Sequence, residues 1–96
     1  EILIDCTSFG NLRTVGTGAA ASRTATATIW IGNVGGGWQP IGSQPIDGNM
    51  QSLVFGPIAG NNNVFPGGEV RIQVRFTSAA QNVTGFEIDK LRIRRN

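Results

Sequence analysis

The chain has no histidine and no tyrosine, and its single cysteine is Cys6. Without histidine it lacks the commonest general base and the commonest zinc ligand, and without tyrosine it lacks a phenolic acid. One cysteine cannot form a disulfide within the chain. Any serine or cysteine nucleophile would lack a recognisable base beside it, so we expect a protein that is not an enzyme and that uses no organic cofactor.

Charge is scarce as well, above all in the middle of the chain. Residues 24–68 contain one ionisable side chain, Asp47, whereas a soluble domain carries charge at about a quarter of its positions. Six of the eight Lys and Arg residues lie from Arg71 onward. The central span offers Thr, Ser, Asn, Gln, Gly and two Trp to its surroundings instead. Such a surface is suited to contact with neutral polar matter, such as sugars or copies of the chain itself.

Long hydrophobic runs and helical periodicity are also missing. No run of about eighteen apolar residues is present, so we expect no insertion into a membrane. Fourteen glycines and four prolines interrupt every window in which an amphipathic helix could form. With 96 residues the chain fits a single domain, residues 1–96.

Alternation of apolar and polar residues, with the period of a β-strand, takes the place of helical periodicity. It is strictest between Arg23 and Ile31, where the apolar residues fall on one face and Trp30 lies with the threonines on the other. We predict an irregular segment at 7–22 and a turn at 44–49. The predicted strands span residues 2–6, 23–31, 38–41, 50–55, 69–77 and 86–94.

The last predicted strand changes parity halfway along. Phe86 and Ile88 fall on one face, whereas Leu91 and Ile93 fall on the opposite one in a regular strand. A slip of one residue moves every side chain to the other face, so a bulge near Asp89 and Lys90 is needed to keep all four on one side. Six to eight short strands without helices predict an all-β fold, an antiparallel jelly-roll-like β-sandwich in which the first and last strands are neighbours.

Two tryptophans are the most suggestive candidates for binding. A flat, exposed indole stacks on the apolar face of a pyranose ring while neighbouring amides bond to its hydroxyl groups. The alternative is that each Trp caps an edge of the core or fills an interface between subunits. The candidate ligand-binding residues are Trp30, Trp38, Asn33, Gln39, Gln44 and Asn49.

The closing segment Phe86-Glu87-Ile88-Asp89-Lys90-Leu91-Arg92-Ile93 resembles the final strand of jelly-roll carbohydrate-binding modules and galactose-binding-like domains. In those families an aspartate near this position often lies by a structural calcium site beside the first strand. The resemblance implies that role for Asp89, with Asp5 opposite. Paired terminal strands would also gather carboxylates, which are ligands for calcium. The alternative is a rim of solvated charges paired with Lys90 and Arg92.

Two functions follow from these features. The first is a non-catalytic binding module that recognises glycan or another neutral polar surface. The second is a structural subunit of a homo-oligomeric surface assembly, such as a virion fibre, a capsid decoration protein or a pilus-like filament, with the charge-free middle buried between copies. Both imply an extracellular, virion or cell-surface location. The basic end lacks interleaved exposed aromatic residues, so we expect no nucleic-acid partner.

Overall fold

The computed structural model describes residues 5–33, 35–59 and 71–95 of the chain. These residues form strands, apart from connecting loops and one short 3-10 helix, η1. Among them, no helix is long and apolar enough to cross a membrane. The elements are β1 Asp5–Gly16, η1 Ala20–Ser22, β2 Ala25–Gly32, β3 Trp38–Ile46, β4 Gln51–Ala59, β5 Ile72–Thr77 and β6 Val83–Arg95.

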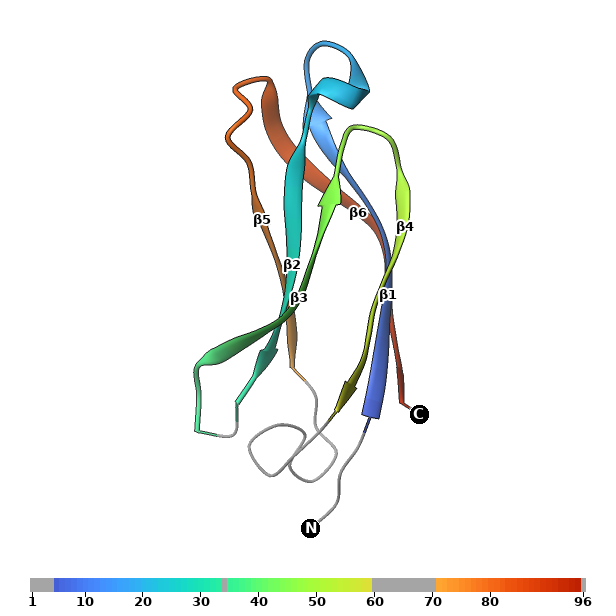
Figure 1. The fold of residues 1–96 in the computed structure, drawn as a ribbon, viewed down its shortest axis with the longest axis vertical. Coiled ribbons are helices and arrows are strands. Elements are labelled where there is room, and N and C mark those ends of the chain that lie inside the picture. Colours follow the sequence, from blue (N-terminus) through green and yellow to red (C-terminus); the bar gives the residue numbers. More distant parts are fainter. Residues whose placement is uncertain (1–4, 34, 60–70, 96) are drawn as a thin grey trace.

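The strands form two three-stranded antiparallel sheets, with the orders β4-β1-β6 and β3-β2-β5. The two sheets face each other in a sandwich-like arrangement along the long axis of the molecule (Figure 1). The described chain is elongated, with extents of 50 × 23 × 15 Å and a radius of gyration of 14.7 Å. A compact domain of this length has a radius of gyration of about 12.5 Å. The core is therefore narrow, and the molecule has a large surface for its size.

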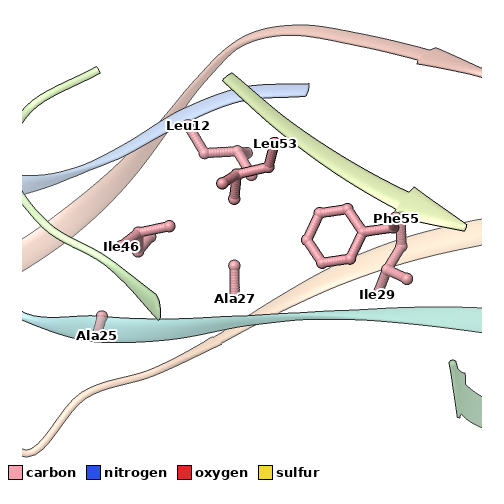
Figure 2. Close-up of a cluster of buried hydrophobic side chains, with 7 residues drawn as sticks. All are labelled: Leu12, Ala25, Ala27, Ile29, Ile46, Leu53 and Phe55. Carbon is pink, nitrogen blue, oxygen red and sulfur yellow. The ribbon is translucent and has the colours of Figure 1, made fainter. Parts of the chain in front are cut away.

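The core lies between the centres of the two sheets (Figure 2). Sheet β3-β2-β5 contributes side chains from β2 and β3, including Ile29, which is fully buried. Sheet β4-β1-β6 contributes side chains from β1 and β4, including Leu12 and Phe55. The full cluster is Leu12, Ala25, Ala27, Ile29, Ile46, Leu53 and Phe55.

Strand β2 confirms the predicted alternation. Ala25, Ala27, Ile29 and Ile31 are buried, whereas the side chains between them are exposed or half-buried. The strand is central in its sheet because β3 and β5 pair with its two edges. Threonine and isoleucine favour an extended backbone, so local preference and burial agree here.

Strand β1 corrects the prediction of an irregular segment at 7–22. The strand continues to Gly16, and Leu12 is its one fully buried large apolar side chain. Its other inward positions carry Ser8, Gly10 and Thr14, all of them buried. Because these residues are small or polar, the strand shows no apolar alternation, and composition alone marked it as a loop.

Strand β3 corrects the prediction of a turn at 44–49. It runs through Pro40 and Pro45 and ends at Ile46. Proline lacks a backbone N–H, so within a sheet it is confined to edge strands or bulges. β3 is an edge strand, and its register shifts where Pro40 lies opposite Trp30. The prolines therefore mark an edge position in the sheet and do not end the strand.

Strands β1 and β6 pair as predicted for the first and last strands. Their register shifts where Asn11 lies opposite Lys90 and Leu12 lies opposite Ile88, so Asp89 is the extra residue. This bulge confirms the prediction from parity, because it places Phe86, Ile88, Leu91 and Ile93 on the face of β1 that carries Leu12. All four side chains are nevertheless between 37% and 45% exposed.

A buried hydroxyl on β1 gives a first prediction of stability. The Ser8 side chain is fully buried, and its Oγ has no hydrogen-bond partner within the described residues. An unsatisfied buried hydroxyl costs about 1 kcal/mol or more. Ser8→Ala is therefore expected to raise the free energy of unfolding by about 1 kcal/mol, which corresponds to about 4–8 °C in Tm for a domain of this size.

Ser43→Ala is the matched control for this variant. The Ser43 hydroxyl shares a 2.8 Å hydrogen bond with Thr28 on the solvent side of the sheet. Its removal is expected to leave stability unchanged or slightly lower. Thermal unfolding followed by circular dichroism measures both variants, and a Tm lower for Ser8→Ala than for Ser43→Ala would contradict the assignment.

Candidate functional site

The outer face of sheet β3-β2-β5 carries the two tryptophans. Trp30 projects from β2 on the side opposite the core, because Ile29 and Ile31 on either side of it are buried inward. Across the sheet, Trp30 lies opposite Pro40 on β3 and Gln73 on β5.

Arg75 lies directly over Trp30. The Arg75 Cζ is 3.9 Å from the centre of the indole ring, which is the geometry of a cation–π contact. The Arg75 Nε also donates a 2.6 Å hydrogen bond to Oε1 of Gln73. The indole Nε1 of Trp30 is shielded from solvent and has no hydrogen-bond partner in the described chain. Trp30 therefore acts as a support beneath the Arg75 guanidinium group.

Trp38 and Arg71 form a second, looser pair at the same end of the sheet. The Arg71 Cζ is 5.5 Å from the centre of the Trp38 ring. Gly32 lies between them: it pairs with Trp38, and its N–H donates a 2.9 Å hydrogen bond to the Arg71 carbonyl. A Cβ at Gly32 would lie 2.9 Å from the Arg71 guanidinium. The absence of a side chain at Gly32 lets Arg71 cross the sheet, where its Nη2 donates to the Asn33 carbonyl.

These contacts define one surface, which we call the Trp–Arg face. Its members are Trp30, Trp38, Arg71, Gln73 and Arg75. No described carboxylate forms an ion pair with either arginine of this face. The described part of the face is therefore cationic. Strands β2 and β3 carry no charge, but Arg75 of β5 and Arg71, which precedes β5, lie beside them.

Of the other predicted ligand residues, Asn33 borders this face through its bond with Arg71, whereas Gln39, Gln44 and Asn49 lie away from it. Asn33 lies in the adjoining β2–β3 turn, where its N–H bonds to Gly37. Gln39 and Gln44 lie opposite Ile31 and Ala27, in register with the inward face, and Gln44 Nε2 donates to the Val54 carbonyl of β4.

Asn49 lies in the turn that follows β3. Its N–H donates a 2.8 Å hydrogen bond to Oδ1 of Asp47, so its backbone closes a local turn. That turn is at the end of β3 opposite to Trp38, which begins the strand. Asn49 is therefore remote from the Trp–Arg face.

Sequence reasoning did not include Arg71, Gln73 and Arg75 among the candidate ligand residues. They lie at alternate positions of the predicted strand 69–77, and all three are exposed. Their pairing with Trp30 and Gly32 joins segments about forty residues apart in the sequence. The alternation of apolar and polar residues indicates which face of a strand a residue lies on. It does not indicate which other strand lies beside it.

The register of the terminal strands places the two aspartates of the expected calcium site far apart along the sheet. Cys6 pairs with Arg95, so Asp5 lies at the carboxyl end of β6, whereas Asp89 bulges out beside Asn11 and Leu12. Six residues of extended strand separate Asp5 from Asn11, which is about 20 Å. The described residues contain no group of three or more His, Cys, Asp or Glu that could hold a metal ion.

Glu87 has a different partner. Its carboxylate accepts hydrogen bonds from Arg13 Nε at 3.0 Å and Nη2 at 2.8 Å. Both side chains are more than 40% exposed, so the pair adds at most about 1 kcal/mol to stability. In the alternative of a solvated rim, Lys90 and Arg92 were the expected partners, but neither forms an ion pair with a described carboxylate.

Comparison with known proteins found no match for this chain among family models, curated proteins or solved structures.

Proposed function

We propose that this protein is a non-catalytic glycan-binding module that holds an acidic sugar chain on its Trp–Arg face. The observation that carries the proposal is the position of Arg75, whose guanidinium lies 3.9 Å above the Trp30 ring. A neutral pyranose could not stack on that side of the indole without displacing the arginine. A carboxylate or sulfate group can instead bind to the arginine where it lies.

The physical case depends on preorganisation. A guanidinium offers paired N–H donors that match a carboxylate or sulfate, and hydrogen bonds to charged groups are the stronger ones. Trp30 and Gln73 already hold the Arg75 side chain in place. The loss of side-chain entropy on binding is therefore smaller than for a free arginine.

The spacing of the charges favours a chain of sugars over a single one. Arg75 lies on β5 and Arg71 directly precedes that strand, four residues earlier in the sequence, so in extended chain their backbones are about 13 Å apart. One monosaccharide does not span that distance, and two acidic units of a polymer do. The Trp38 ring centre lies 5.5 Å from the Arg71 Cζ, so this indole is less closely covered by its arginine than Trp30 is. It offers a platform for the apolar face of an intervening sugar ring.

The fold that accompanies this proposal is a short jelly roll. The first strand pairs with the last, β1 with β6, and the second pairs with the second-last, β2 with β5. Such nested pairing is what the rolling of a long antiparallel hairpin produces. These two nested pairs support the jelly-roll interpretation of the sandwich, whereas β3 and β4 lie in different sheets.

Calorimetric titration with an oligomer of a uronic acid, and with its carboxyl-reduced neutral counterpart, tests the proposal. We expect binding of the acidic oligomer and at least about tenfold weaker binding of the neutral one, because a charged hydrogen bond contributes about 1.5–3 kcal/mol. Arg75→Gln is expected to weaken binding of the acidic oligomer by a similar factor.

Arg94→Gln is the matched control. It makes the same change of charge on the other sheet, at an exposed position opposite Thr7. We expect it to retain most of the affinity. If Arg75→Gln and Arg94→Gln lost equal affinity, the binding would be a general attraction between a basic protein and an acidic polymer. If the neutral oligomer bound as tightly as the acidic one, the role of the arginines would be refuted.

A second candidate, the structural subunit of a homo-oligomeric surface assembly, is favoured by one observation. Seven consecutive residues, Ile88 to Arg94, are exposed on an edge strand. An apolar edge strand of this kind is a template for pairing with another chain.

A further inference from the structure

Strand β6 presents an unpaired edge with apolar side chains. In the described chain β6 pairs on one side only, with β1, and it is the last strand of its sheet (Figure 1). Ile88, Leu91 and Ile93 all lie on its inward face but are 39–45% exposed. The facing edge strand β5 meets this face at one end, where Phe76 stacks on Phe86 with ring centres 4.4 Å apart.

The pattern of side-chain types in β6 is complementary to the same pattern read in the opposite direction. About a centre between Asp89 and Lys90, the apolar residue Ile88 falls opposite Leu91, and Phe86 falls opposite Ile93. The charged residues are complementary about the same centre. The four charged members, all on or beside the outward face, are Glu87, Asp89, Lys90 and Arg92.

We propose that β6 pairs antiparallel with β6 of a second copy of this chain, in the register that sets Asp89 opposite Lys90. In this register each of the two strands places Glu87 opposite Arg92 of the other. Phe86 meets Ile93 and Ile88 meets Leu91, so the exposed apolar side chains cover each other as cross-strand pairs.

The bulge is compatible with this register. Both copies carry the extra residue Asp89 at the same place, and a two-fold axis brings the two bulges together at the centre of the interface. The inward and outward positions therefore stay matched on both sides of it. A two-fold interface is self-complementary by construction, which is the property that the sequence of β6 has.

The charges indicate a second copy as the occupant. Lysine on an edge strand ordinarily opposes pairing, because its charge would lie against the edge strand of an unrelated protein. Here Asp89, Lys90 and Arg92 form no ion pair with a described residue, and the second copy supplies the opposite charge at each position.

Charge exchange at the centre of the interface tests both the dimer and its register. Sedimentation equilibrium is expected to give a dimer for the unchanged protein. Asp89→Lys places one lysine opposite each Lys90 of the dimer, and Lys90→Asp places one aspartate opposite each Asp89. Because each substitution acts twice across the axis, we expect each to weaken self-association about 30-fold.

Two further samples restore the complementarity. The double variant Asp89→Lys/Lys90→Asp is expected to dimerise again, and an equimolar mixture of the two single variants is expected to form the heterodimer, which native mass spectrometry separates by mass. Circular dichroism checks that every variant is folded.

A protein that is monomeric at high concentration, or a mixture that does not associate, would overturn the proposal. Dimers that all the variants form equally would overturn the register. The inference does not depend on sugar binding, because it specifies the contact between copies in the assembly candidate. The protein can therefore be monomeric and still bind the acidic oligomer, or form the dimer and bind no sugar.

Discussion

Ile29→Ala is expected to lower the free energy of unfolding by about 3 kcal/mol, which corresponds to about 12–24 °C in Tm. Ile29 is fully buried at the centre of β2 and packs among side chains from both sheets (Figure 2). The truncation removes apolar contacts and leaves a cavity that a narrow core cannot close. A domain of this length has about 5–14 kcal/mol of stability in total, so a large share of it would be lost.

Thr26→Ala on the same strand is the control for this variant. Thr26 is exposed on the outer face, so its truncation is expected to change stability by less than about 0.5 kcal/mol. Denaturation by urea with circular dichroism as the readout compares the two. If Ile29→Ala lost no more stability than Thr26→Ala, the two sheets would not share the core described above.

Gly16→Ala is expected to be about as damaging, although it adds only one methyl group. A Cβ at Gly16 would lie 1.9 Å from the backbone oxygen of Asn82. Backbone cannot rotate away as a side chain does, so the strand ends must separate. That movement strains the 3.0 Å hydrogen bond from Thr17 N–H to the Asn82 carbonyl and the bonds from Asn82 Nδ2 to Thr17 and Ser22. We expect a loss of about 2–3 kcal/mol.

Gly85→Ala provides the opposite case on the neighbouring strand. A Cβ at Gly85 would meet nothing within 4 Å. Replacing a glycine inside a strand by alanine removes conformational freedom from the unfolded chain, so a gain of up to about 1 kcal/mol is expected. Thermal unfolding of the two variants should therefore give shifts of opposite sign. Shifts in Tm of the same sign for Gly16→Ala and Gly85→Ala would contradict the close approach of Gly16 to the Asn82 backbone.

Strands were predictable where burial and side-chain type agree. Residues Ala25 to Ile31 alternate strictly, and the parity change in β6 alone was enough to place a bulge at Asp89. In β1, by contrast, the buried positions of Ser8 and Thr14 carry polar side chains. The period of two is present there, but not in hydrophobicity, so no pattern of apolar residues could show it.

The candidate site was half predictable for a related reason. The sequence placed Trp30 on an outward face, and the structure agrees. Which strand lies beside it depends on the pairing of β2 with β5, and that pairing brings Arg75 over the ring. Whether a surface is neutral or charged depends on which strands pair. The charge-free stretch of sequence gave no sign that Arg71 and Arg75 lie beside Trp38 and Trp30 in the folded sheet.

The two proposed surfaces can act together. The Trp–Arg face is on the outer side of sheet β3-β2-β5, and the free edge belongs to the other sheet, β4-β1-β6. Antiparallel strands within one sheet are related by an axis perpendicular to it, so the paired copies would present their Trp–Arg faces to the same side. A dimer could then engage one polysaccharide at two places, and linked weak sites bind more tightly than either alone.

The most direct test of the central claim, that the Trp–Arg face receives an acidic sugar, is a titration followed by ¹H–¹⁵N NMR of the indole and arginine Nε signals. With an oligomer of a uronic acid, the account predicts saturable shifts of Arg75, Arg71 and Trp38, and no shifts with the carboxyl-reduced oligomer. Shifts confined to Arg92 and Arg94, or equal shifts with both oligomers, would contradict it.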